Sequence, residues 1–144
     1  MGDAKGLKFQ AACERKPHGG KTCIRIDYSA KDGWAGVVWQ SPANDWGDKA
    51  GGWDVSGAKR LRFWARGENG GEVVNFFFGV VGRDKRYHDT ASGKLDKATL
   101  TAEWKEYAID LGDKDLTRVK TGFGFSLAGQ GAPVTFYLDD IRFE

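Results

Sequence analysis

The sequence has few of the residues that identify an activity by themselves. Its 144 residues include 2 cysteines, 2 histidines, 3 prolines and 1 methionine. It contains no CxxC pair, no HExxH motif and no cluster of cysteine and histidine, so a zinc site is not indicated. No apolar run is long enough to cross a bilayer. These absences argue against proteins that are recognised by a metal-binding or membrane-spanning motif.

Charge of either sign is not in excess. Lysine and arginine total 22 and aspartate and glutamate total 20, which leaves a net charge of +2 at pH 7. The two signs are interspersed, whereas binding to nucleic acid or a membrane surface needs a basic patch or stripe. The sequence therefore predicts neither as a partner. The length is enough for one core and too short for two, which predicts a single domain over residues 1–144.

Glycine and aromatic residues are abundant, with 21 Gly, 9 Phe, 6 Trp and 4 Tyr. Many turns and many flat rings are typical of all-β proteins. Alternating or β-branched patterns predict strands at residues 22–30, 33–41, 58–67, 72–82, 121–129 and 133–144.

The passage 94–113 has large apolar residues at both helical and strand spacing. Its threonines and Gly112 favour two strands joined by a turn, and residues 113–119 are expected to form a single helical turn. Many short, closely spaced strands without a long helix predict an all-β fold, a two-sheet antiparallel jelly-roll β-sandwich.

The strand near residues 120–128 alternates between large and small side chains. The large residues belong in the core of a sandwich, so the opposite face, with Gly122, Gly124 and Ser126, is expected to point outward as a flat floor. The same alternation sends outward two pairs of residues from neighbouring segments: Arg62 with Trp64, and Asn75 with Phe77. If these three strands share a sheet, an aromatic ring and planar polar groups surround an open floor.

Such a surface suits a sugar, whose ring has an apolar CH face and a rim of hydroxyl groups. Trp34 and Trp39 are five residues apart and should lie on opposite faces of a strand, and we expect Trp39 to be the accessible one. The alternative is that these tryptophans have a structural role and pack in the core. The remaining candidates are Trp46, Trp53, Arg86, Tyr87 and Gln130.

Catalysis is not indicated, because no pair of carboxylates stands out and neither histidine belongs to a recognisable triad. Cys13 and Cys23 flank a turn-like stretch and are equally consistent with a disulfide and with two buried free thiols. Asp139 and Asp140 close the last strand. Alternation turns one of them inward, where it needs an arginine or lysine partner or a hard cation such as calcium.

The segments PHGGKTCIRIDY, GWAGVVWQSPANDWG, GGWDVSGAKRLRFWARG and VTFYLDDIRFE resemble the galactose-binding-like β-sandwiches that occur as carbohydrate-binding modules beside bacterial polysaccharide-degrading enzymes. The resemblance spans nearly the whole chain. It implies a secreted, non-catalytic module, linked to a glycoside hydrolase, that binds a plant or microbial polysaccharide of β-glucan or xylan type on a concave sheet face. The resemblance also implies a second possible location, the loops at one end, which Trp46 and Trp53 favour. It also implies a structural calcium held by Asp139, the carbonyl of Lys21 and Asp3.

Two other functions remain open at this point. The same aromatic face would also suit a structural or adhesion domain that docks another part of a larger secreted protein. A small polysaccharide lyase or hydrolase on the same scaffold is the third possibility, because one fold hosts many functions.

Overall fold

The computed structural model describes all of residues 1–144 and consists almost entirely of strands. None of its helices is both long and apolar enough to cross a bilayer. The elements are one short 3-10 helix and nine strands: η1 Ala4–Gly6, β1 Leu7–Cys13, β2 Cys23–Tyr28, β3 Trp34–Gln40, β4 Arg60–Gly67, β5 Val73–Phe78, β6 Gly93–Thr99, β7 Lys105–Asp110, β8 Thr121–Ala128 and β9 Val134–Phe143.

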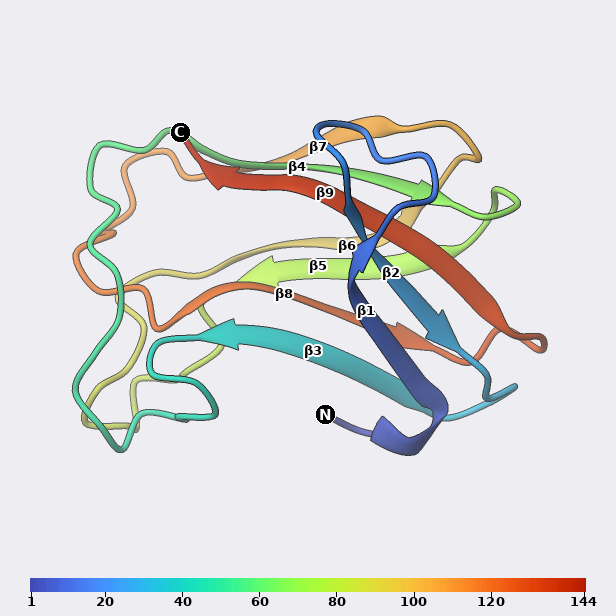
Figure 1. Ribbon diagram of the computed structural model, residues 1–144. Coiled ribbons are helices and arrows are strands. Elements are labelled where there is room, and N and C mark those ends of the chain that lie inside the picture. The colour runs from blue at the N-terminus through green and yellow to red at the C-terminus, as the bar shows by residue number, and fades with distance from the viewer.

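The strands form two antiparallel sheets that pack as layers. The five-stranded sheet has the order β1-β2-β9-β4-β7, and the four-stranded sheet has the order β3-β8-β5-β6. Figure 1 shows β9, β4 and β7 in the upper layer, β3, β8, β5 and β6 in the lower layer, and β1 and β2 running obliquely at the right. The predicted all-β, two-sheet antiparallel sandwich is confirmed.

The predicted strands are present, most of them shorter at their ends, and residues 94–113 form β6 and β7 as expected rather than a helix. The predicted helical turn at 113–119 is wrong. That segment is extended at Val119, which exchanges two backbone hydrogen bonds of 2.9 Å with Trp53. β1 was not predicted, although Leu7 and Phe9 alternate with Lys8 and Gln10; five of its seven residues are exposed.

The core lies between the two sheets and is rich in aromatic rings. Phe63 of β4 contacts Phe76 of β5 and Phe123 of β8, with ring centroids 4.6 and 5.1 Å apart. Phe125 of β8 meets Phe136 of β9 at 5.2 Å. Each contact joins one sheet to the other, so these strands have their large side chains turned inward and their alternate residues turned to the outer surface.

The long connections 41–59 and 79–92 lie together at one end of the sandwich, at the left of Figure 1. Beneath them Lys120 is completely buried, and its Nζ lies 2.5 Å from both Asp45 Oδ2 and the carbonyl oxygen of Lys49. The hydrogen bond from the Lys120 ammonium holds the pKa of the Asp45 carboxyl below its usual range. This ion pair anchors the loop that includes Trp46 and Trp53.

We expect Lys120→Met to destabilise the protein, because the Asp45 carboxylate would then be buried without a cation. Urea unfolding at neutral pH should give a lower midpoint than that of wild type, whereas Lys114→Met, which changes an exposed lysine, should not. In wild type the contribution of the pair is complete above the ordinary aspartate pKa of about 3.9 and is lost as the pH falls through the lowered folded-state value. Equal midpoints for the two variants at neutral pH would contradict this role.

Candidate functional site

The structure does not bring the predicted site residues together but spreads them over several separate surfaces. β5 and β8 are neighbours in the four-stranded sheet, but β4 lies in the opposite sheet. The expectation that segments 58–67, 72–82 and 121–129 share one sheet is therefore wrong. Phe63 of β4 meets Phe76 and Phe123 across the core, with ring planes tilted by 51° and 54°, so β4 packs against their strands from the opposite sheet.

Asn75 and Phe77 lie on the outer face of the four-stranded sheet, as predicted. They are opposite Ser126 and Gly124 of β8, respectively. The Phe77 ring lies directly on Gly124, where a Cβ atom would meet three ring atoms at 3.1 Å or less. Only glycine at position 124 lets this ring lie against the strand. The surface that was predicted to be open above the small residues of β8 is therefore covered at Gly124 by the Phe77 ring.

Polar groups surround this ring. Asn75 Nδ2 donates to Ser126 Oγ at 3.3 Å, and Asn75 Oδ1 accepts the Lys97 backbone N–H at 2.8 Å, so the amide plane is fixed. Lys94 and Asp96 form an exposed ion pair of 3.0 Å at the rim. We call this surface the sheet-face groove, a cavity of about 420 Å³ lined by Asn75, Phe77, Phe78, Gly79, Val80, Ser92, Gly93, Lys94, Asp96 and Ser126.

The rim residues Lys94 and Asp96 were not among the predicted site residues. They belong to β6, which pairs with β5. Nothing in the sequence indicates which strand lies beside β5, so no local signal could have brought these two side chains to the groove.

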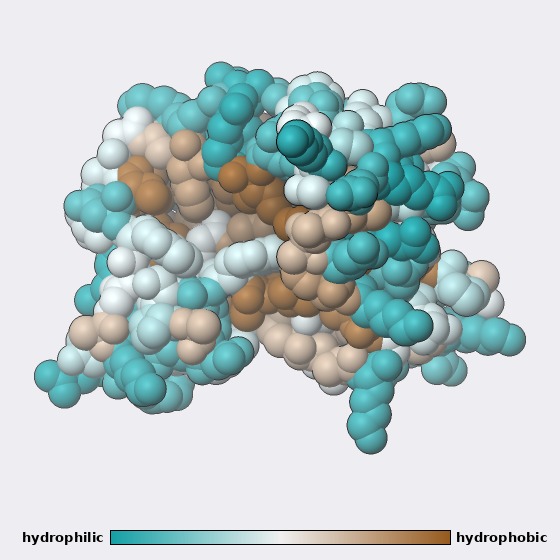
Figure 2. Space-filling model, in the orientation of Figure 1, coloured by the Kyte–Doolittle hydropathy of each residue, from teal (hydrophilic) through white to brown (hydrophobic).

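A second cavity opens between the two sheets. Figure 2 shows it as an apolar hollow between the layers, with polar side chains around its mouth. Its volume is about 420 Å³, and Arg142 is its only charged lining residue. We call it the inter-sheet hollow; it is lined by Trp39, Trp53, Val55, Gly122, Phe123, Ile141, Arg142 and Phe143.

The expectation that Trp39 is the accessible member of its pair is wrong. Its register places it opposite Phe123, so both side chains face inward, and their ring centroids are 5.5 Å apart. Trp34 is the exposed one, with 51% of its surface accessible. Gly122 also differs from expectation, because it lies at an irregularity in the β3–β8 register and meets the Trp53 ring in the hollow.

Three further candidates lie at the loop end of the sandwich. Trp46 is exposed, and the Arg86 guanidinium lies 5.2 Å from the centroid of the Tyr87 ring. Gln130 lies elsewhere: its Oε1 accepts the Val73 backbone N–H at 3.1 Å and its Nε2 donates to the Val73 carbonyl at 3.0 Å. Both ends of the Gln130 amide are thus used in holding the start of β5, and none of these four residues lines the sheet-face groove.

Arg62 and Trp64 lie on the outer face of the five-stranded sheet, away from the groove. The Trp64 ring is stacked on His18, with centroids 3.8 Å apart and planes 17° apart. Arg62 forms ion pairs with Glu106 and Glu144. The predicted partnership of Trp64 with the glycine floor is therefore corrected: one face of its indole is covered by His18, and the neighbouring guanidinium is already neutralised.

Asp139 holds the turn that the resemblance connects with calcium, but it does so by hydrogen bonds. Its Oδ2 accepts the backbone N–H groups of His18 and Gly19 at 2.9 and 3.0 Å, and its Oδ1 accepts that of Asp140 at 2.8 Å. Asp139 is half-buried and Asp140 is exposed; Asp140 adopts a positive φ of 49°, which interrupts the alternation at that residue.

Asp3 lies at the opposite end of the five-stranded sheet from Asp139. Its Oδ1 accepts the Gly6 N–H at 3.3 Å, and the Tyr28 hydroxyl donates to its Oδ2 at 3.5 Å. No three side chains of the His, Cys, Asp or Glu type are grouped to hold a metal ion. Asp3 and Asp139 therefore do not share one site, so the predicted set of Asp139, Lys21 and Asp3 does not come together.

The fold is shared with solved carbohydrate-binding modules. The family 30 module of the cellulosomal cellulase Cel9D-Cel44B of Clostridium thermocellum matches 96% of this chain and 86% of its own, with a TM-score of 0.64 and 20% identity. A family 11 module from Clostridium thermocellum, in complex with a β-1,3-1,4-mixed-linked tetrasaccharide, matches 95% of this chain and 81% of its own, with a TM-score of 0.59 and 15% identity. The architecture is thus that of β-sandwich carbohydrate-binding modules.

The sequence itself places the chain in one family. The family model described as Carbohydrate binding domain 30 matches residues 6–144, and the chain belongs to this family. It is a non-catalytic carbohydrate-binding module, as the sequence predicted. No curated protein matches the sequence.

A much longer structure has the same fold within it. The structure of the glycoside hydrolase domain of Endo-D from Streptococcus pneumoniae R6 matches 100% of this chain with a TM-score of 0.67 and 15% identity, but only 21% of that longer chain is covered.

Because Asp3 lies apart from Asp139, we expect a chelator to leave the thermal stability unchanged. Melting curves with and without EGTA should superimpose, whereas Asp139→Ala should lower the melting temperature by removing the acceptor of three backbone N–H groups. Asp96→Ala, which removes an exposed carboxylate with a single ion-pair partner, is the matched control. A fall in melting temperature with EGTA, restored by added calcium, would contradict the expectation.

Proposed function

We propose that the module binds a β-linked glucan chain in the sheet-face groove. The observation that carries this proposal is the Phe77 ring packed against Gly124 beside Asn75 and Ser126. A pyranose stacks its CH face on such a ring and directs its hydroxyl groups to the surrounding amide, hydroxyl, ammonium and carboxylate groups. The groove offers all of these within one open cavity.

The inter-sheet hollow is less suited to the same ligand, although it contains two indoles. Most of its lining is apolar, with Arg142 its only charged residue. A sugar buried there would leave most of its hydroxyl groups without partners, and each unpaired buried group costs free energy. The groove avoids this cost because its polar groups lie beside the ring.

A mixed-linked β-1,3-1,4-glucan is the ligand we propose first. The similar family 11 module was solved with a tetrasaccharide of this linkage, which supports the choice. Xylan is the alternative polysaccharide, because a β-1,4-linked xylose chain also has rings with apolar faces. Comparing the two glycans on the isolated module distinguishes them.

We further propose that the module belongs to a secreted protein that degrades polysaccharides. Support comes from two similar structures, a module of a cellulosomal cellulase and the longer Endo-D glycoside hydrolase structure. A module of this kind would hold the enzyme at its substrate and so raise the local concentration of glycosidic bonds.

We expect Phe77→Ala to weaken binding to mixed-linked glucan oligosaccharides by about 1–3 kcal/mol, by analogy with the stacking of bases on aromatic rings. This corresponds to about a 5- to 150-fold rise in Kd, measured by isothermal titration calorimetry. Circular dichroism and thermal melting show whether each variant remains folded.

Two tryptophan variants serve as controls. Trp64→Ala should bind as wild type, because Trp64 lies on the other sheet and stacks on His18. Trp53→Ala tests the inter-sheet hollow. If Trp53→Ala abolished binding while folded Phe77→Ala bound normally, the sugar would lie in the hollow and the groove assignment would be wrong.

A further inference from the structure

Cys13 and Cys23 lie directly opposite each other at the end of the β1–β2 ladder. Cys13 is the last residue of β1, Cys23 is the first of β2, and the antiparallel register pairs them. Opposed residues in such a ladder have Cα atoms about 4.5–5.5 Å apart. A disulfide requires a Cα separation of about 4.4–6.8 Å, so the strands already place the two residues at bridging distance.

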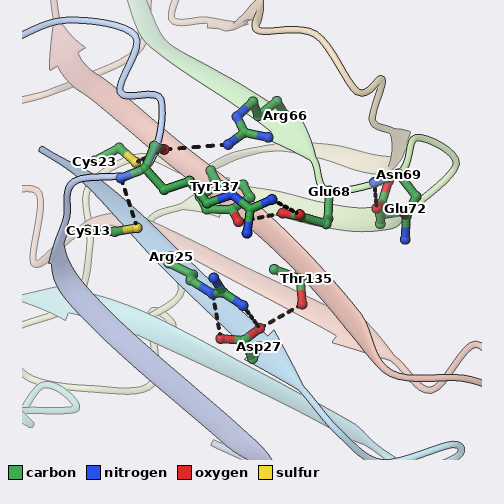
Figure 3. Close-up of polar contacts among 11 residues, drawn as sticks. Cys13, Cys23, Arg25, Asp27, Arg66, Glu68, Asn69, Glu72, Thr135 and Tyr137 are labelled. Atoms are coloured by element: carbon green, nitrogen blue, oxygen red, sulfur yellow. Dashed lines mark hydrogen bonds and ion pairs between the residues drawn. The ribbon is translucent and has the colours of Figure 1, made fainter.

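Both cysteines are buried, with exposed fractions of 5% and 3%, and they pack against Tyr137. Their sulfur atoms have only weak partners, as Figure 3 shows for Cys13: the Arg15 N–H donates to Cys13 Sγ at 3.5 Å, and the Cys23 thiol donates to the Arg15 carbonyl at 3.7 Å. Burial, with the Cys13 thiol close by, raises the pKa of the Cys23 thiol to about 11. The Cys23 thiol is therefore protonated at neutral pH.

Metal binding does not account for this pair. A structural zinc site needs four ligands, usually cysteine and histidine. No three side chains of the His, Cys, Asp or Glu type are grouped to hold a metal ion, at the cysteines or elsewhere in the structure. Two opposed thiols without further ligands are suited to oxidation to a disulfide.

The pair also closes a segment, residues 14–22, that is held against the outer face of the five-stranded sheet. Trp104 Nε1 donates to the Lys16 carbonyl at 2.8 Å, His18 stacks on Trp64, and Arg66 reaches the Arg15 carbonyl at 3.5 Å. β1 is an edge strand whose only neighbour in its sheet is β2. A covalent bond at this point would join the edge strand to the sheet and fix the base of the segment.

We propose that Cys13 and Cys23 form an intramolecular disulfide when the module meets a disulfide oxidant such as oxidised glutathione. One cysteine thiolate attacks the glutathione disulfide, forms a mixed disulfide and releases one glutathione thiolate. The second cysteine thiolate attacks the cysteine sulfur of that mixed disulfide and releases the other glutathione. The two cysteines lose two protons and two electrons, and the oxidised glutathione is reduced to two thiols.

This bridge stabilises the module by restricting the unfolded chain. For a loop of this length in a domain of this size, we expect the melting temperature to rise by about 5–10 °C. The nucleophile is the thiolate. Because the pKa of Cys23 is raised to about 11, the thiolate fraction of Cys23 is small at neutral pH and grows as the pH increases. We therefore expect the rate of bridge formation to increase with pH. The proposal does not depend on sugar binding, because the groove lies on the other sheet.

The test uses the full chain, first reduced with dithiothreitol, then freed of it and incubated with oxidised glutathione. Free thiols are alkylated in urea, so that burial does not protect them, and the intact mass is measured. We expect a monomer about 2 Da lighter than the reduced protein, with no alkylated cysteine. Its melting temperature should be higher than that of the reduced form, and dithiothreitol should reverse every change.

Cys13→Ala and Cys23→Ala are matched controls that each keep one alkylatable thiol and should show no rise in melting temperature. If a variant does not fold, the mass and alkylation of the wild-type chain decide the question alone. Two thiols that are still alkylated after the incubation would overturn the proposal. So would a stable glutathione adduct or a disulfide-linked dimer in place of the bridged monomer.

Discussion

Contact between aromatic rings across the two sheets determines what each strand shows to solvent. Phe63 meets Phe76 and Phe123, so β4 faces β5 and β8 through the core. Because side chains alternate along a strand, turning these rings inward turns Asn75 and Phe77 outward. The proposed sugar-binding face thus depends on contacts inside the core, because these rings fix the half-buried Phe77 on the outer surface.

The sequence predicted the faces of individual strands better than their neighbours. On β8 the alternation of large and small residues identified both the core face and the face on which Phe77 lies. Strand pairing depends on contacts between distant residues, so nothing local indicated that β4 belongs to the other sheet. The same limit explains the errors at Trp64 and Trp39: a ring that is outward-facing or accessible by spacing can still be covered by His18 or packed on Phe123.

The segment 14–22 shows how one stretch of chain is held by several weak contacts. Asp139 accepts its backbone N–H groups, His18 stacks on Trp64, and the cysteines lie at its base. Hydrogen bonds, stacking and the proposed covalent bond all act on the same turn. In an oxidising compartment the proposed covalent bond would persist and would add to the stability of this small module.

Gly124 has a consequence for how specificity can change in this family. The tilt of the Phe77 ring is set by the absence of a side chain beneath it. A methyl group at this position would collide with the Phe77 ring and force the ring to move away from the strand. If glycan chains stack on Phe77 as proposed, residue 124 sets the orientation of that ring although it does not line the groove itself.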